Sequence, residues 1–261
     1  GHMYSRIAEA KSKKNVDILF LGSSHAYRGF DTRLFAKNGL VTFNLGSSAQ
    51  TPIHTKVLVN RYLTNLNPKL VIFEVYPEVF TFDGVESSLD IIANDKNDFS
   101  SIKMALELNN IKTYNTLLYG FTSDLLGIND NFNEAVIKGD DKYISGGFVQ
   151  NKISHCKPTK IGKKSISINP KQLKAFEEIV NLIKSKKIDL LLVNAPIPKA
   201  KYNSFTNKKY FDGIMTKHSK YLNFNEIITL NDSTHFYDAD HLNQLGVEVF
   251  NAKLIEILNN R

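Results

Sequence analysis

The stretch VDILFLGSSH, residues 16–25, decides the fold that we expect for this chain. Apart from Asp17, its first six residues are apolar, and an apolar run of this length that stops at Gly22 predicts a short buried strand. Ser23 and Ser24 follow at the carboxyl end of that strand. In open α/β sheets this edge is where ligands bind. The stretch therefore predicts a sheet with serine side chains at its ligand-binding edge.

Apolar runs and helical patterns alternate along much of the chain. Further strands are predicted at residues 40–45, 70–76, 188–194 and 227–230, and helices at residues 33–37, 54–66, 170–187, 204–222 and 244–258. Strands that alternate with helices favour a parallel sheet. We therefore expect a single α/β domain over residues 4–261, with a mainly parallel sheet of about five strands.

The alternation stops between residues 80 and 168. An amphipathic stretch at 87–126 is followed by a polar, glycine-bearing segment at 127–168. We expect these residues to form an insertion of helices and loops over the carboxyl edge of the sheet, where loops commonly select the substrate. A separate domain is disfavoured because strongly apolar runs are few there.

Composition limits the classes of partner. The net charge of +7 comes from lysines spread over the sequence. A solvated lysine-rich surface explains it, and attraction to an anionic polymer such as a cell-envelope glycan is the sharper alternative. Nucleic acid is not expected as a partner, because the sequence has no arginine-rich helix, zinc pattern or RNA-binding signature. No apolar run approaches the roughly 18 residues of a membrane span, so the chain as given is expected to be soluble.

Three features of the ends and of single residue types complete this picture. Gly1, His2 and Met3 look like the remnant of a cleaved tag, which leaves room for a signal peptide or a membrane anchor upstream. The single cysteine, Cys156, permits no internal disulfide and is interpreted as a bystander thiol. The seven histidines include no pair at helical ligand spacing with a third ligand at hand, so neither a metal nor another cofactor is expected.

A second element, DADHLN at residues 238–243, supplies the partners that a serine nucleophile needs. Asp238 lies three residues before His241, close enough to orient the imidazole and leave its other nitrogen free as a general base. Asp240 is less suited, because neighbouring side chains tend to diverge. The same spacing recurs in Asp232 and His235, but only His241 directly precedes the amphipathic closing helix. A serine early in the chain, with aspartate and histidine late, is one order of a hydrolytic triad.

These motifs together resemble the SGNH/GDSL hydrolase superfamily. Gly22-Ser23-Ser24 matches its first block, the DADH motif matches its last, and Gly46 matches the oxyanion-hole glycine of its second. The resemblance implies a flavodoxin-like three-layer α/β/α sandwich over residues 16–258, outside the insertion. By position it makes Ser24 the nucleophile, with Asp238 and His241, and implies an oxyanion hole from the N–H groups of Ser24 and Gly46.

The chain departs from the family pattern at two places. Ser23 replaces the usual aspartate, and the third block is absent, since residues 74–78 read EVYPE. The asparagine that donates to the oxyanion is therefore missing, and loss of one such donor commonly costs about 2.7–4 kcal/mol. The variant pattern is similar to a branch that includes alginate O-acetyltransferase-like proteins and proteins that handle D-alanyl esters of lipoteichoic acid. This resemblance implies acyl chemistry on a cell-envelope glycan, outside the cytoplasmic membrane.

Other polar residues are expected near the same edge of the sheet, as substrate contacts or supporting residues. Ser23 and His25 flank the nucleophile, and Gln50 either faces the pocket or starts a helix. Asn194 and Glu74 end strands there, and we favour a lysine or arginine partner for Glu74. Arg28 is expected to pair with Glu74 or Asp31, or to contact an anionic substrate.

Three functions follow from these observations. The favoured one is a serine esterase or O-acyltransferase that acts on acylated cell-envelope carbohydrate through an acyl-serine, with water or a sugar hydroxyl as acceptor. The second is a lipid or small-ester hydrolase with an apolar acyl pocket from the insertion. The third is a non-catalytic glycan-binding or assembly protein with a decayed triad. The sequence does not indicate the oligomeric state. The residues expected to line the acyl pocket are Phe80, Phe82, Leu117, Leu118 and Phe121.

Overall fold

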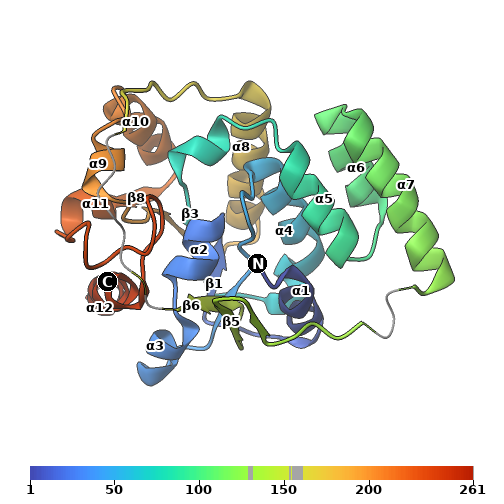
Figure 1. Ribbon diagram of the computed structural model, residues 1–261, viewed down its shortest axis with the longest axis horizontal. Helices are drawn as coiled ribbons and strands as arrows, with labels where there is room; N and C mark the ends of the chain where they lie inside the picture. The colour runs from blue at the N-terminus through green and yellow to red at the C-terminus, as the bar shows by residue number, and fades with distance from the viewer. Residues whose placement is uncertain (129–131, 153, 155–160, 261) are drawn as a thin grey trace.

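A five-stranded parallel sheet forms the centre of the computed structural model, which describes residues 1–128, 132–152, 154 and 161–260 (Figure 1). Cys156 lies outside the described residues. The strand order is β2-β1-β3-β7-β8, which is the flavodoxin-like order when these five strands are numbered along the chain. The predicted α/β fold is therefore confirmed. The strands are β1 (Ile18–Leu21), β2 (Thr42–Asn44), β3 (Leu70–Glu74), β7 (Asp189–Asn194) and β8 (Lys220–Asn223).

Both faces of the sheet are covered by helices because both carry apolar side chains. Along β1, Ile18 and Phe20 belong to one buried cluster, whereas Leu19 and Leu21 belong to the other. Successive side chains of a strand point to opposite faces, so a strand buried on both sides needs a continuous apolar run. One face is covered by α1 (Met3–Ser12), α4 (Pro52–Leu66), α8 (Pro170–Ser185) and α10 (Lys208–His218). The other is covered by α2 (Ser24–Gly29), α3 (Thr32–Lys37), α11 (Phe224–Ile227) and α12 (Gln244–Asn259).

The prediction of the fifth strand at residues 227–230 is wrong. The strand that pairs with β7 is β8, seven residues earlier, and a short helix, α11, follows it directly. Asn223 explains the break, because its side chain accepts the N–H of Asn225 and starts α11. Ile228 and Leu230, which suggested a strand, pack against the core from an irregular segment instead. β8 lies at an edge of the sheet and is half exposed, so its apolar pattern is weak.

The helices of the insertion pack on the α4 side of the molecule, at the right of Figure 1. They are α5 (Val85–Asn94), α6 (Phe99–Leu108) and α7 (Ile111–Leu126). The short helix η1 (Pro77–Phe80) precedes them and packs through Phe80 against α8 and α10. Arg61 of α4 connects the helices around the sheet to the insertion, through ion pairs with Asp95 at 2.8 Å and Asp98 at 2.7 Å. None of the helices in the described ranges has the length and hydrophobicity that a transmembrane helix needs.

The polar part of the insertion contains strands that the sequence did not predict. A small antiparallel sheet has the order β4-β5-β6 and contacts α2 through β6. The turn before β6 passes close to the end of β2, where the N–H of Asn44 donates to Gly146. This part of the insertion therefore lies next to the helix that begins with Ser24. The strands are β4 (Ile137–Lys138), β5 (Asp141–Ile144) and β6 (Phe148–Asn151).

Candidate active site

The turn between β1 and α2 presents Ser24 at the carboxyl edge of the sheet. Gly22 has φ of +136°, and a Cβ atom at this position would lie 2.8 Å from both the Cβ and the carbonyl oxygen of Glu74. Only glycine meets both conditions, because it tolerates this backbone region and has no side chain. Ser23 then precedes α2, its hydroxyl accepting the N–H of His25, and Ser24 is the first helical residue.

The structure brings together the three residues of the predicted triad. Nε2 of His241 lies 2.8 Å from Oγ of Ser24, and Nδ1 lies 2.9 Å from Oδ2 of Asp238. Asp238 also accepts the N–H groups of Asp240 and His241, each at 2.7 Å. Since an ionised carboxylate only accepts, Nδ1 carries the proton and Nε2 accepts from the serine hydroxyl.

The protonation states suit a neutral base beside a carboxylate. Burial lowers the pKa of His241, although Asp238 opposes this effect, so the ring is neutral at pH 7. Partial burial alone would raise the pKa of Asp238. The hydrogen bond and the charge of His241 outweigh this effect and lower the pKa of Asp238 to about 2. Near neutral pH the pair is therefore a carboxylate that orients an uncharged imidazole.

The competing aspartate and histidine do not form such a pair. Asp232 accepts the N–H groups of Lys199 and Ala200, and so caps the short helix α9 (Lys199–Tyr202). Nδ1 of His235 lies 3.0 Å from the N–H of Asn231. The two side chains thus stabilise their own loops.

His25 and Asp240 form a second connection between α2 and the loop that carries His241. Nε2 of His25 lies 3.1 Å from the carbonyl oxygen of Asp240 and 3.3 Å from its Oδ1. Tyr76, after β3, packs against His25 with ring centroids 4.0 Å apart and donates its hydroxyl to Asp240 at 3.1 Å. Lys201 of α9 completes the cluster, with Nζ 2.8 Å from Oδ1 of Asp240 and 3.0 Å from Oε2 of Glu78. Tyr76, Glu78 and Lys201 were not anticipated.

Glu74 is buried without the expected basic partner. Its Oε2 accepts from Ser23 at 3.3 Å, while Oε1 has no hydrogen-bond partner among the described residues. The prediction of a lysine or arginine partner is wrong, since the described part of the chain holds no such ion pair. Burial raises the pKa of Glu74 to about 7, although the nearby His25 lowers it. Ser23 also lies 3.2 Å from Nδ1 of His25, so the polar contacts continue from Glu74 to Asp240.

Arg28 pairs with the insertion. Its NH1 and NH2 groups each lie 2.8 Å from an oxygen of Asp141 on β5. The expected pairing with Glu74 or Asp31 is therefore wrong, and Asp31 pairs with Arg33 instead. The sequence could not identify Asp141 because the segment around it shows no periodic pattern.

Gln50 and Asn194 support their own elements. Nε2 of Gln50 donates to Thr55 at 2.9 Å, near the start of α4. Nδ2 of Asn194 lies 3.4 Å from the hydroxyl of Tyr221 on the neighbouring strand. Their side-chain oxygens are buried without a partner among the described residues. No described hydrogen bond joins either residue to the triad.

The two expected oxyanion donors differ in availability. The N–H of Ser24 has no acceptor among the described residues, as is usual for the first residue of a helix. The N–H of Gly46 already donates to Oδ1 of Asn44 at 3.0 Å, and Nδ2 of Asn44 donates to Ala26 at 2.8 Å. Gly46 therefore reaches an oxyanion only by sharing its hydrogen or after Asn44 moves. The hydroxyl of Ser47, on the same loop, is buried without a partner among the described residues.

The residues expected to line an acyl pocket are dispersed. Phe80 packs in the core against Phe176 and Phe211, and Leu117 is buried under α7. Leu118, next along α7, is exposed to solvent, as is Phe82. Phe121 is partly buried against the core. These positions do not define one apolar cavity beside Ser24.

Among the described residues, one group of side chains is spaced closely enough to hold a metal ion: His25, Asp240 and His241. Their candidate ligand atoms lie within 4.8 Å of one another. However, Lys201 already neutralises Asp240, and Nε2 of His241 is engaged with Ser24. A cation would have to displace both partners, so the donor set fits a hydrogen-bond network better than a metal.

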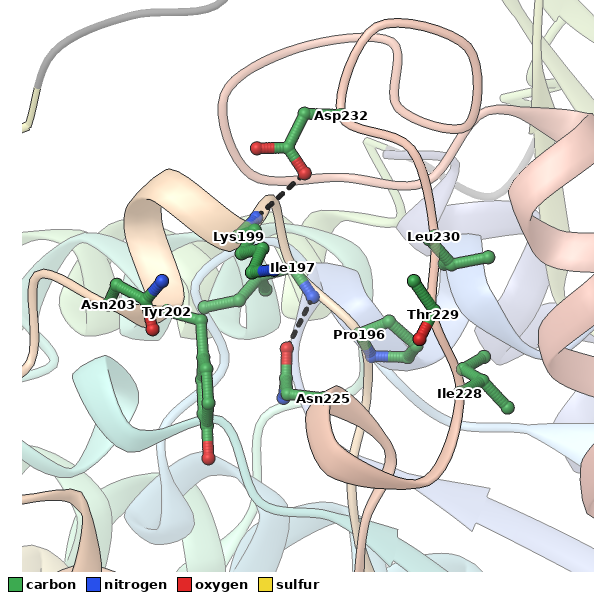
Figure 2. A pocket seen from close by; sticks show the side chains of 10 residues that line it. All are labelled: Pro196, Ile197, Lys199, Tyr202, Asn203, Asn225, Ile228, Thr229, Leu230 and Asp232. Carbon is green, nitrogen blue, oxygen red and sulfur yellow. Dashed lines mark hydrogen bonds between the residues drawn. The ribbon is translucent and has the colours of Figure 1, made fainter.

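A pocket of about 170 Å³ lies next to α9, at the carboxyl ends of β7 and β8 (Figure 2). In Figure 2 the side chains of Asp232 and Asn225 point to the backbone N–H groups of Lys199 and Ile197. The triad does not line this pocket. Helix α9 lies between the pocket and the triad: its Lys199 and Tyr202 line the pocket, and its Lys201 pairs with Asp240, next to His241. The lining residues are Pro196, Ile197, Lys199, Tyr202, Asn203, Asn225, Ile228, Thr229, Leu230 and Asp232.

Two solved structures resemble this chain over nearly its whole length. One, described as a "putative acylhydrolase" of Bacteroides fragilis NCTC 9343, is 12% identical, with a TM-score of 0.46 over 97% of this chain and 94% of that chain. The other, a "GDSL-like lipase" of Bacteroides thetaiotaomicron VPI-5482, is also 12% identical, with a TM-score of 0.49 over 98% and 97%. No family model and no curated protein matches the chain. The strand order of the sheet identifies the fold, and the contacts among Ser24, His241 and Asp238 indicate the chemistry that the site can perform.

Proposed function

We propose that this protein is a serine-dependent esterase or O-acyltransferase that acts on acylated carbohydrate of the cell envelope. One observation carries the proposal: the continuous hydrogen-bond path from Ser24 through His241 to Asp238, with distances of 2.8 and 2.9 Å. Serine, histidine and aspartate in this order of contact are the groups that activate a hydroxyl for attack on an acyl carbon.

In the proposed first half-reaction, Oγ of Ser24 attacks the carbonyl carbon of the ester. Nε2 of His241 takes the serine proton, and Asp238 stabilises the imidazolium that results. The tetrahedral intermediate collapses as the bond to the sugar oxygen breaks, and His241 returns its proton to that oxygen. The products are a free sugar hydroxyl and an acyl-serine.

In the second half-reaction an acceptor oxygen attacks the acyl-serine. His241 takes the proton of the acceptor and then returns one to Oγ of Ser24, which restores the free enzyme. Water as acceptor gives hydrolysis, and a sugar hydroxyl gives transfer. Which acceptor reacts depends on how well the site excludes water.

The oxyanion donors in this proposal are the N–H of Ser24 and the N–H of Gly46. Ser24 is free to donate in the described contacts, whereas Gly46 must share its hydrogen with Asn44. Weakening of the contact between Gly46 and Asn44 as negative charge develops on the carbonyl oxygen would make the second donor available. Each aligned donor contributes a few kcal/mol, so this movement would restore the second donor, while the position of the third-block asparagine stays without a donor.

Two observations support carbohydrate over lipid as the acylated partner. The apolar residues expected for an acyl pocket are dispersed, and the pocket beside α9 mixes amide, hydroxyl and charged groups with apolar ones. The ring of Tyr237 also stacks on His241, with centroids 5.6 Å apart, and offers an aromatic surface next to the base. We infer an extracytoplasmic location from this substrate class. An intact triad argues against a protein that only binds glycan.

The test compares ester hydrolysis by the wild type with that of two serine variants. Hydrolysis of p-nitrophenyl acetate is expected to be lost in Ser24→Ala and retained in Ser233→Ala, which changes an exposed serine of the loop before Asp238. Activity on an O-acetylated polysaccharide, followed as released acetate or as acetyl groups on an added oligosaccharide, then separates hydrolysis from transfer. Equal rates for the wild type and Ser24→Ala would refute the proposal.

A further inference from the structure

A large share of the exposed apolar surface is gathered on the insertion. Among the described residues, twelve of the eighteen large hydrophobic side chains that are exposed belong to residues 99–137. Monomeric proteins rarely expose extended apolar surface without an interaction that covers it. We define the outer face by the exposed apolar side chains of α6 and α7, which are Phe99, Ile102, Leu106, Ile111, Leu118, Tyr119, Leu125 and Leu126.

One side of α7 packs against the rest of the insertion, and a second, apolar side is exposed. Gly120 lies on the packed side, where a Cβ atom would be 2.8 Å from Ile92 of α5. Ile111, Leu118 and Leu125 recur every seven residues on the opposite side and are 69%, 71% and 86% exposed. In Figure 1, α7 is the outermost helix on its side of the molecule. The core does not account for this apolar stripe.

The charges around the outer face leave a positive excess. Glu107 of α6 pairs with Lys56 of α4, and Asp124 of α7 accepts hydrogen bonds from Asn97. Lys103 and Lys112 are exposed, and neither has an ion-pair partner among the described residues. Asp124 is exposed and keeps its charge, because Asn97 is an uncharged partner. With two free lysines against this one carboxylate, the net charge left on the face is positive. A second copy would repeat this positive excess, whereas anionic headgroups would neutralise it.

We propose that the outer face of α6 and α7 binds the surface of a lipid bilayer that contains anionic headgroups. Helices with exposed leucine and aromatic side chains and flanking lysines lie in the interface of such a membrane, with the apolar residues below the headgroups and the lysines among them. The bilayer supplies both an apolar layer for Leu118 and Leu125 and phosphates for Lys103 and Lys112. This contact is independent of the proposed catalysis, because the face contains no triad residue.

The absence of tryptophan from the chain allows a direct test. A Leu118→Trp variant carries its only indole on the outer face, and Val249→Trp carries it on α12, where Val249 is 42% exposed. Each is titrated with vesicles of phosphatidylcholine alone and of equimolar phosphatidylcholine and phosphatidylglycerol. The emission of the Leu118→Trp variant should shift to the blue with the anionic vesicles and be quenched by brominated lipid, while that of Val249→Trp should not change.

Sedimentation with vesicles tests the two parts of the face separately. Leu118→Gln combined with Leu125→Gln should abolish binding, and the matched pair Leu245→Gln and Val249→Gln on α12 should retain it. Lys103→Gln or Lys112→Gln should weaken binding to the anionic vesicles about fivefold each. All these side chains are exposed, and circular dichroism checks that each variant is folded.

Three outcomes would overturn the proposal. The first is no change in the emission of the Leu118→Trp variant with either vesicle, and the second is an equal change in the variants at positions 118 and 249. The third is a blue shift that grows with protein concentration in the absence of lipid, together with a doubled mass in analytical ultracentrifugation, which would assign the face to a second copy of the chain.

Discussion

The imidazole rings of His25 and His241 are stacked, with centroids 4.9 Å apart and planes 23° from parallel. His25 directly follows the nucleophile in sequence, whereas His241 is 217 residues away from Ser24. Because His25 also contacts the backbone and side chain of Asp240, it holds the loop of the base against the helix of the nucleophile. Alignment of the triad therefore depends on a histidine that does not itself touch Ser24 Oγ or Asp238 in the described contacts.

The first prediction concerns the pH dependence of catalysis. His241 must be neutral to act as base, and burial together with the charge of His25 lowers its pKa, so kcat/KM should fall only below pH 6.5. Burial opposes protonation of His25, but the carboxylate of Asp240 outweighs it and raises the pKa of His25. His25→Gln removes this charge and should move the acid limb of the pH profile to higher pH.

The control for His25→Gln is the thermal unfolding temperature, measured at the pH of maximal activity. A variant with a lower maximal rate and an unchanged acid limb would contradict the electrostatic part of this prediction. A purely structural role for His25 would give that result, because it lowers the amount of aligned triad without changing the pKa of the base.

The second prediction separates the two Asp-x-x-His motifs. Asp238→Asn removes the acceptor that keeps the proton on Nδ1 of His241, so kcat should fall by roughly three to four orders of magnitude. Asp232→Asn changes the residue that caps α9, in the second motif, and should leave kcat near that of the wild type. Steady-state hydrolysis of p-nitrophenyl acetate measures both, and comparable losses in the two variants would argue against Asp238 as the orienting carboxylate.

The third prediction is a pH-dependent loss of stability that originates at Glu74. Its pKa rises from 4.5 to about 7 in the folded protein, so the folded state keeps a proton that the unfolded state releases between these values. The free energy of unfolding should therefore fall as the pH rises from 4.5 to 7, by about 3 kcal/mol at most. Glu74→Gln should remove this part of the pH dependence.

Urea unfolding at several pH values between 4 and 8 tests the role of Glu74. The difference in stability between Glu74→Gln and the wild type should grow in favour of the variant as the pH rises. If the two curves run parallel over this range, Glu74 does not titrate as described.

The fourth prediction concerns the link between α2 and the small sheet. Arg28 and Asp141 form a two-point contact with both side chains mostly buried. Arg28→Ala and Asp141→Ala should each destabilise the protein, and the double variant should lose less than the sum, with a coupling energy of about 1–2 kcal/mol. Chemical unfolding of the four proteins measures this coupling, and strictly additive losses would mean that the pair contributes nothing as a pair.

The sequence predicted the parts of the site that are local in the chain. The strand before Gly22 is a continuous apolar run, and Asp238 and His241 are three residues apart, so both motifs are visible without a structure. The contacts of Asp240 were not visible, because Tyr76 and Lys201 come from two other segments and reach it only through the strand order of the sheet.

Two failures have separate physical causes. The fifth strand was misplaced because an edge strand needs few apolar residues, while Ile228 and Leu230 pack as an irregular segment. The partner of Arg28 was missed because Asp141 belongs to a short strand in a polar segment, where tertiary contacts rather than periodicity decide the structure.

The most direct test of the central claim is the site of reaction with a fluorophosphonate, which reacts preferentially with an activated serine. Peptide mapping of the labelled wild-type protein should find one adduct, on Ser24, that is absent in His241→Ala and retained in Ser233→Ala. An adduct on another residue, or labelling of Ser24 that persists undiminished in His241→Ala, would contradict a nucleophile activated by His241.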